Sequence, residues 1–479
     1  MTLPGPVFLM GGLFGGAVVL QLLRRWTGLM AWLAVVITGG MSLFIALVPL
    51  GRRLSLGPVT VSLGDPLNLF GRLLIIEPVD RLPIMFIGTT AALIFVIAWR
   101  LLPHSNFFPV GLAIVALLAG SLMVEQVVFA ALMIEMAAVL TVFPLHEPVE
   151  RADGRRYGGR IKGGLQYLVY ATLALPGLMV TQLLLEQFAI FPADLQLLRT
   201  ATILLSLSLA LLLGAVPFQS WLSSVATDGS PPVVTFLFTI NVGTVWFLLL
   251  AYLETYRWLS VQTAFGSLFT SVGLLMMVIG GALAASQRRL GRLVGYATLV
   301  DNGAMFVAIG TGQVAGLSLT LIILMARPLA LGLMTLGLDG LRRLGKGSDA
   351  IDQLAGAAWR APWRTLAFMV GGVAMAGFPL SPGFAARWGL YRLMAEASLF
   401  QAVLALVGSS GVMMGLISAV RALLTPGSGS DRGAALTEDR VVVILIFVLL
   451  GCTLALGLFP QPLSQVALQM AQGFSFFAP

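Results

Sequence analysis

The stretch RTLAFMVGGVAMAGFPLSPGFAARWGLYRLMA, residues 364–395, is an apolar run with an internal break. A bilayer core of about 30 Å needs about 20 apolar residues per helix, so the run is long enough to span. Pro379 and Pro382 interrupt it, since proline lacks a backbone donor and breaks helices. Irregular backbone at membrane depth is tolerated where it is buried in protein or lines a cavity. The stretch predicts a broken transmembrane helix that carries Arg387.

The composition of the whole chain is that of a membrane protein. Of the 479 residues, 58% are hydrophobic and only 10% are charged, and the mean hydropathy is +0.97. These values exclude an ordinary soluble domain. The formal charge of +8 comes from arginines in short loops between apolar runs, which is typical of a polytopic membrane protein and argues against nucleic-acid binding.

The apolar runs predict an all-α polytopic membrane protein with about 14 transmembrane helices. The predicted spans lie near residues 5–23, 28–49, 82–102, 107–124, 126–145, 164–185, 200–222, 231–252, 264–285, 293–312, 314–341, 364–395, 400–423 and 440–460. Residues 51–81 contain too many Gly, Pro and charged residues to span, so we expect an external loop with short strands or an amphipathic turn.

The distribution of basic residues predicts the orientation. Of the 28 Lys and Arg residues, nineteen lie in loops after odd-numbered spans, seven lie in loops after even-numbered spans, and Arg327 and Arg387 lie inside spans. Cytoplasmic loops carry the excess of basic residues. We therefore expect both termini outside the cytoplasm.

A second interrupted run predicts an internal repeat. Gly214-Ala-Val-Pro-Phe-Gln-Ser-Trp221, with Pro217 at its centre, precedes Gly377-Phe-Pro-Leu-Ser-Pro382 by five spans. Because five is odd, the second copy must be inverted, as in many ion transporters. We predict helices 1–3 with the external loop in residues 1–106, two inverted five-helix repeats in 107–253 and 264–424, and a last helix with a short tail in 425–479.

Four ionisable residues stand out within the predicted spans, where a charge is expensive and is a functional candidate. They are Glu135, Asp301, Arg327 and Arg387. Glu135 could instead form an ion pair that orders helix packing, and Arg387 could extend toward the membrane surface. Asp301 could titrate or simply pair with an arginine. Pro328 frees a backbone carbonyl beside Arg327, which could serve function or a structural ion pair.

Redox chemistry is not predicted within this chain. The sequence contains one cysteine, two histidines near loops, and no glycine-rich nucleotide-binding motif. Iron–sulfur and structural zinc sites need several cysteine or histidine ligands. We expect no cofactor in this chain.

Four patches together resemble the antiporter-like membrane subunits of respiratory complex I, membrane-bound hydrogenases and Mrp-type cation/proton antiporters. The resemblance covers about residues 107–424. The patches are Leu132-Met-Ile-Glu-Met-Ala-Ala138, Ala215-Val-Pro-Phe-Gln-Ser-Trp-Leu222 continued by Asp228-Gly-Ser-Pro-Pro-Val233, Arg289-Leu-Gly-Arg-Leu-Val-Gly-Tyr-Ala-Thr-Leu299, and Gly377-Phe-Pro-Leu-Ser-Pro-Gly-Phe384 with Arg387 downstream.

The resemblance implies a proton pathway and also shows departures from it. It assigns Glu135 as the titrating acid, Arg387 as the fixed positive partner in the exit half, Asp301 as an extra proton site and Arg327 as an electrostatic modulator. Leu212 stands near the family's seventh-helix lysine, and Asn241 and Val242 stand near its eighth-helix lysine. Arginine stays protonated and is a poor proton carrier.

The leading hypothesis is a proton-translocating, antiporter-like subunit of a complex I-type (NADH-quinone oxidoreductase) or hydrogenase-type complex. Its partners would be other membrane subunits, the lipid bilayer, and protons or Na⁺, and its location the prokaryotic cytoplasmic membrane. NADH, flavin, iron–sulfur clusters or NiFe, and quinone would be bound by partner subunits. The alternatives are a non-pumping scaffold paralogue and an Mrp-type cation/proton antiporter subunit.

Overall fold

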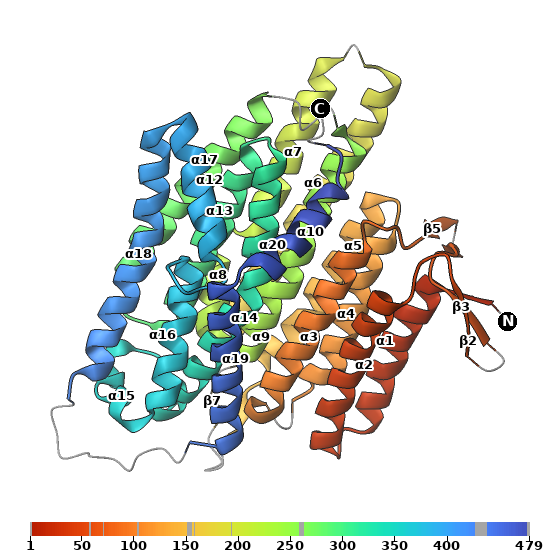
Figure 1. Ribbon diagram of the computed structural model, residues 1–479. Coiled ribbons are helices and arrows are strands. Elements are labelled where there is room, and N and C mark those ends of the chain that lie inside the picture. The colour runs from red at the N-terminus through yellow and green to blue at the C-terminus, as the bar shows by residue number, and fades with distance from the viewer. Residues whose placement is uncertain are drawn as a thin grey trace.

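Long helices running side by side dominate the computed structural model, which describes residues 2–56, 59–69, 71–102, 105–150, 156–157, 159–192, 194–257, 263–426 and 438–476 (Figure 1). Twelve helices among these residues are long and apolar enough to cross a membrane, and a shorter apolar helix covers Phe107–Met123. With the broken span near residues 364–395, each predicted span coincides with a helix or a pair of helices. The prediction of an all-α polytopic membrane fold is confirmed.

Most spans are single continuous helices. They are α1 (Gly5–Leu22), α2 (Thr27–Leu47), α3 (Arg81–Leu101), α4 (Phe107–Met123), α5 (Val127–His146), α6 (Ile161–Ile190), α12 (Thr263–Ala285), α13 (Leu290–Gly310), α14 (Val314–Leu344), α18 (Leu399–Leu424) and α19 (Arg440–Leu458).

Three spans are irregular. The seventh consists of α7 (Leu195–Leu213) and α8 (Ser220–Asp228), and the twelfth of α16 (Pro362–Ala376) and α17 (Phe384–Ala397). Both breaks begin at a left-handed glycine, Gly214 with φ +66° and Gly377 with φ +71°, a conformation that glycine adopts without steric cost. The eighth consists of α9 (Pro231–Phe236), a π-helical turn η1 (Leu237–Asn241) and α10 (Val242–Thr255).

The segment between α2 and α3 forms short strands, as expected for residues 51–81. β2 (Arg53–Leu56) pairs antiparallel with β3 (Val59–Ser62), which pairs parallel with β1 (Thr2–Pro4) near the start of the chain. The other small elements are β4 (Leu67–Leu69) with β5 (Arg72–Leu74), β6 (Val149–Glu150) with β7 (Arg156–Tyr157), the 3₁₀ turn η2 (Ile351–Leu354) and α15 (Ala357–Arg360).

The sequence did not predict α20 (Gln461–Gln472), which follows α19 and crosses the bundle diagonally over α14 (Figure 1). Its glutamines and serine alternate with apolar residues, so a hydropathy search for spans passes over it. Ala467, Met470 and Ala471 on its apolar face are buried.

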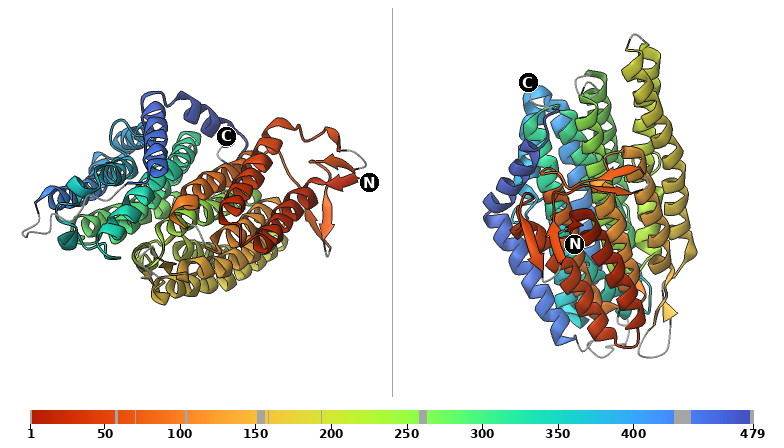
Figure 2. Two further views of the ribbon diagram at one scale, coloured as in Figure 1. Left: turned by 90° about the horizontal axis from the view of Figure 1, so that it is seen from below. Right: turned by 90° about the vertical axis from the view of Figure 1, so that its right-hand side faces the viewer.

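The most enclosed helices mark the centre of the bundle. The span Pro231–Thr255 is 100% buried over its most apolar stretch, and α13 and α14 are each 89% buried, whereas α19 is only 22% buried. The views in Figure 2 show α1 and α2 at one end of the elongated bundle, beside the strands. Polar side chains on α13 and α14 are therefore far more enclosed than those on the outer helices.

Candidate functional site

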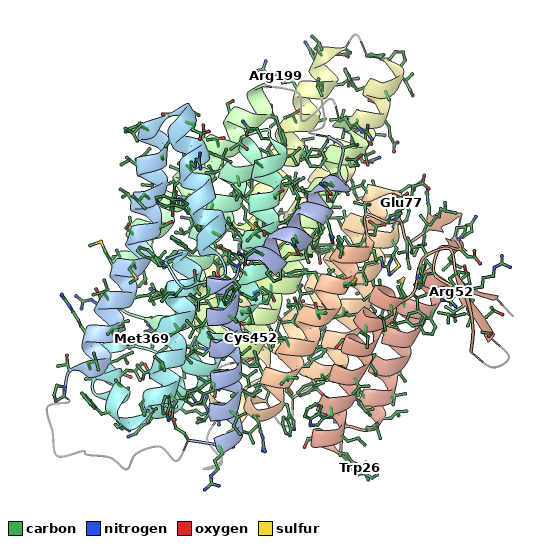
Figure 3. All side chains as sticks on the ribbon, viewed as in Figure 1. Trp26, Arg52, Glu77, Arg199, Met369 and Cys452 are labelled. Carbon is green, nitrogen blue, oxygen red and sulfur yellow. The ribbon has the colours of Figure 1, made fainter. Side chains whose placement is uncertain are left out.

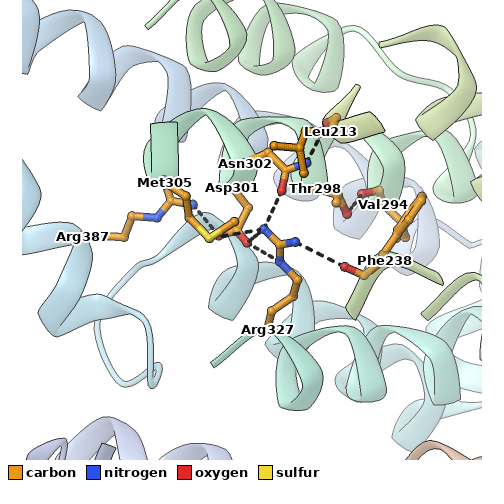
Figure 4. Close-up of polar contacts among 9 residues, drawn as sticks. All are labelled: Leu213, Phe238, Val294, Thr298, Asp301, Asn302, Met305, Arg327 and Arg387. Atoms are coloured by element: carbon orange, nitrogen blue, oxygen red, sulfur yellow. Dashed lines mark hydrogen bonds and ion pairs between the residues drawn. The ribbon is translucent and has the colours of Figure 1, made fainter. Parts of the chain in front are cut away.

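Asp301, Arg327 and Arg387 meet in the core of the bundle (Figure 4). Arg327 contributes Nε and Nη2 to Asp301 Oδ2, both at 2.7 Å, and Arg387 donates Nη2 to Asp301 Oδ1 at 2.7 Å. Asp301 is 5% exposed and each arginine 1%. One carboxylate thus bridges two guanidinium groups, and we call these three residues the arginine–aspartate cluster.

Three helices that are distant in sequence bring the cluster together. Asp301 lies on α13, Arg327 on α14, and Arg387 in the first turn of α17, just beyond the twelfth-span break. A Cβ at Gly377 would lie 2.3 Å from Arg387 Cγ. The glycine therefore provides both the left-handed turn and the space through which the arginine side chain passes.

Arg327 links the cluster to the eighth span. It donates Nη1 to the carbonyl oxygen of Phe238 at 3.2 Å, and Phe238 lies within the π-helical turn η1. A π-helical turn alters the regular hydrogen-bond pattern and often occurs at functional sites. Pro328, immediately after Arg327, adds a second irregularity inside α14.

Asn302 extends the network to the first broken helix. Its Oδ1 accepts Arg327 Nη2 at 2.7 Å, and its Nδ2 donates to the Leu213 carbonyl oxygen at 2.9 Å. Leu213 is the last residue of α7, directly before the seventh-span break. A continuous set of hydrogen bonds therefore joins the end of α7 to the start of α17.

The three residues of the cluster are buried, and in their ionised forms they carry a net charge of +1. A guanidinium stays protonated in proteins, so the Asp301 carboxylate balances only one of the two. Breaking a buried ion pair by removing one partner is strongly destabilising because it leaves an uncompensated charge. The pairing of Asp301 with an arginine, one of the two alternatives for this acid, is the arrangement that the structure contains.

Glu135 lies elsewhere, on α5, and is partly exposed. Thr172 on α6 donates Oγ1 to its Oε1 at 2.6 Å. Among the described residues, Glu135 makes no ion pair and no hydrogen bond to the arginine–aspartate cluster. Of the four predicted site residues, the structure thus gathers three and separates the glutamate.

A neutral polar residue, Asn241, also contacts the helices around Glu135; in the sequence it stands out only for its place near the family's eighth-helix lysine. Asn241 donates Nδ2 to Thr141 Oγ1 at 2.9 Å and to the Tyr167 hydroxyl at 3.4 Å. Thr141 lies on α5, as Glu135 does, and Tyr167 lies on α6, as Thr172 does, so this amide contacts the same two helices that carry Glu135 and its partner. Asn241 ends η1, so the turn that presents the Phe238 carbonyl to Arg327 also carries this amide.

The three predicted helix-breaking prolines lie where the chain leaves helical geometry. Pro217 falls between α7 and α8, and Pro379 and Pro382 fall between α16 and α17. Leu212 is 7% exposed and Val242 2%, so both positions near the family's lysines are buried and apolar. Within the described residues, no group of three or more His, Cys, Asp or Glu side chains could hold a metal ion.

The fold and this site define a class: polytopic membrane proteins in which broken helices meet at buried ionisable groups, as in ion transporters. Residues 164–414 match the family described as NADH:quinone oxidoreductase/Mrp antiporter, transmembrane. This match covers more than half of the chain, and the chain belongs to that family.

Similar proteins agree with this assignment. NADH-quinone oxidoreductase subunit N of Methylococcus capsulatus is 26% identical over 328 residues, covering 65% of this chain and 66% of that protein. Subunit N of Acidithiobacillus ferrooxidans is 27% identical over 273 residues, covering 55% and 54%. The matched region spans between half and two thirds of these relatives.

Two solved structures share the fold along nearly the whole chain. A chain of the Mrp complex from Dietzia sp. superposes with a TM-score of 0.79 at 15% identity, covering 99% of this chain and 97% of that one. A chain of respiratory complex I from Thermus thermophilus gives 0.71 at 18% identity, covering 99% and 100%.

Proposed function

We propose that this chain is an antiporter-like membrane subunit of a complex I-type or hydrogenase-type oxidoreductase, and that it contributes to proton translocation driven by electron transfer in partner subunits. The supporting observation is the arginine–aspartate cluster, whose hydrogen bonds connect both broken helices through Asn302 and Arg327. Ionised groups buried this deeply in a membrane protein mark ion pathways.

The geometry suggests which of the two ion pairs can open. Each Asp301 oxygen accepts a guanidinium N–H, so withdrawal of one arginine would free an oxygen of the carboxylate for another partner. Arg387 follows a non-helical segment and can move with α17, whereas Arg327 is fixed by three further partners, the Phe238 carbonyl, Asn302 and the Met305 sulfur. Movement at the twelfth-span break would therefore expose Asp301, while Arg327 stays in place and acts electrostatically.

Glu135 is the proposed titrating acid of the other half. Thr172 holds one of its oxygens, and Asn241, Thr141 and Tyr167 provide neutral groups that can orient water between Glu135 and η1. Arginines bias such a path through their charge but do not carry its protons. The proposal places NADH, flavin, metal clusters and quinone in partner subunits, and the chain in a prokaryotic cytoplasmic membrane with both termini outside.

Proton translocation by the liposome-reconstituted parent complex tests this function, with Glu135→Gln compared with wild type. Electron-transfer rate and subunit composition are measured on the same preparation. Glu125→Gln, an exposed carboxyl group between α4 and α5, is the matched control. The proposal requires that Glu135→Gln lower the protons moved per electron while assembly, electron transfer and the control remain unchanged.

A scaffold role is the second candidate, and the buried Leu212 and Val242 favour it because they offer no charge where the family carries lysines. Under that role Glu135→Gln and Asp301→Asn would leave the proton stoichiometry of the complex unchanged. A third candidate is a cation/proton antiporter subunit, because the matching family includes Mrp antiporters as well as NADH:quinone oxidoreductases. Exchange that depends on Na⁺ and needs no electron donor would establish that role.

A further inference from the structure

A small cavity adjoins the arginine–aspartate cluster. Its walls are the three cluster residues, side chains of α14 and α16, and the backbone before α17; they include Ala326, Ala330, Ala374, Pro382 and Gly383. Its volume is about 10 Å³, close to the least space that can hold one water-sized particle. The cavity therefore accommodates a single small molecule or ion beside the two guanidinium groups.

Arg387 presents a free donor at this place. Its Nη2 is bonded to Asp301, but its Nη1 is buried and has no hydrogen-bond partner among the described residues. The whole residue is 1% exposed and lines the cavity. A buried N–H without an acceptor is costly, and such groups in native proteins are nearly always satisfied. The free Nη1 calls for an acceptor in the cavity.

The charge of the site selects the kind of acceptor. Two guanidiniums face one carboxylate, whose two oxygens both already accept arginine N–H groups. Pro382 and Gly383 line the cavity and directly precede α17 (Phe384–Ala397), so the positive end of that helix dipole also adjoins it. A water molecule would satisfy Nη1 but leave the net charge of +1 uncompensated. An anion does both.

We propose that this cavity binds one small monovalent anion, with chloride as the abundant candidate, and that Arg387 Nη1 donates to it. Bound chloride would make the cluster neutral: two guanidiniums, one carboxylate and one anion. Because the site depends on the charge balance of this chain alone, it stands whether or not the chain pumps protons. Binding and release of the anion would set the net charge beside Asp301 without any change of protonation.

Equilibrium binding of radioactive chloride to the purified full chain in lipid nanodiscs tests the proposal without turnover. We expect one saturable site per chain, competed by bromide and not by the larger anion gluconate. We also expect a higher midpoint of thermal unfolding in sodium chloride than in sodium gluconate at equal ionic strength. A folded wild-type chain without saturable chloride binding would overturn the proposal and leave the cavity to water.

Variants locate the site. Ala330→Val fills the cavity without touching a charge, and Arg387→Gln removes the donor; both should abolish chloride binding. Ala297→Val, at a fully buried position on α13 that does not line the cavity, is the matched control for the added methyl groups and should still bind chloride. Chloride binding that survives in both Ala330→Val and Arg387→Gln would place the ion elsewhere and refute the assignment.

Discussion

At the scale of single residues, the chain uses Asp301 as the only described counter-charge of two buried arginines. Asp301→Asn removes this charge and leaves both guanidiniums uncompensated. We expect the free energy of unfolding to fall by about 3–5 kcal/mol, the usual effect of breaking a buried pair. Reversible unfolding in mixed detergent and dodecyl sulfate measures it.

A double variant separates lost charge balance from lost packing. Asp301→Asn combined with Arg387→Gln leaves one guanidinium and no carboxylate, so it removes the electrostatic repulsion between the arginines. Residues in one network couple strongly, and we expect the double variant to be less destabilised than the sum of the single variants. Simple additivity would show that the cluster residues do not act as a unit.

The backbone at Gly377 leads to a second prediction at this scale. Its φ of +71° is unfavourable for a residue with a side chain. An added Cβ would also lie only 2.3 Å from Arg387 Cγ. Gly377→Ala should destabilise the chain by at least about 1 kcal/mol, since alanine at positive φ is strained. Gly451→Ala in α19, where a Cβ meets nothing within 4 Å, is the control and should be neutral or mildly stabilising. Equal effects of the two substitutions would contradict this account.

The sequence was sufficient to identify the cluster residues but not their partners. A charge inside an apolar run is visible from hydropathy alone, which is why Asp301, Arg327 and Arg387 could be selected. Their convergence depends on how α13, α14 and α17 pack, and no local pattern encodes that. The roles of the Phe238 carbonyl and Asn241 depend on the π-helical turn, which has no composition signal of its own.

At the scale of elements, the start of α3 is held to the end of α2 by Arg81, which donates Nε to the Ile45 carbonyl at 2.8 Å and Nη2 to the Ala46 carbonyl at 2.8 Å. Asp80, just before the helix, is half-buried. The pKa of Asp80 is raised from 3.8 to about 7, chiefly by burial; a hydrogen bond from the Glu77 backbone N–H acts to lower it, and the nearby Glu77 carboxylate acts to raise it.

This raised pKa predicts a pH dependence with a definite sign. The folded chain binds the Asp80 proton more tightly than the unfolded chain does. Protonation of Asp80 therefore adds to the free energy of unfolding; this contribution is complete below pH about 4 and is lost as the pH rises through about 7. Asp80→Asn should flatten the fall in unfolding midpoint between pH 5 and 8. Asp352→Asn, at an exposed carboxyl group, should not. A wild-type midpoint that rises over this range, with the rise lost in Asp80→Asn, would reverse the assigned sign.

Transmembrane elements follow from the sequence because each apolar run must satisfy its backbone within one helix. The two breaks were also predictable, because at each one a glycine precedes proline within a few residues, Gly214 before Pro217 and Gly377 before Pro379 and Pro382. Proline alone is not sufficient, since Pro328 lies inside the continuous helix α14. α20 could not be found in this way. Its burial against α14 comes from a narrow apolar face on a short, glutamine-rich segment, and only the folded bundle supplies the surface that covers it.

At the scale of the whole molecule, a few contacts connect regions far apart in the chain. Asn302 and Arg327 tie the end of α7 to the cluster on α17, so the two broken helices share one network. α14, with 31 residues, passes through the centre and carries Arg327 beside its internal proline. The two breaks are therefore joined by buried polar contacts that do not pass through the exposed outer helices.

The orientation of the molecule in the membrane gives the last prediction. Figure 3 shows Trp26, between α1 and α2, and Arg199, near the start of α7, at opposite ends of the bundle. The excess of basic residues in loops after odd-numbered spans predicts that the Trp26 end lies in the cytoplasm. The chain has one cysteine, Cys452, so Cys452→Ser provides a cysteine-free background. In that background, Arg199→Cys should react with a membrane-impermeant maleimide added outside intact cells or spheroplasts, whereas Trp26→Cys should react only after permeabilisation. The opposite labelling pattern would invert the topology, and with it the side from which protons would enter the half that contains Glu135.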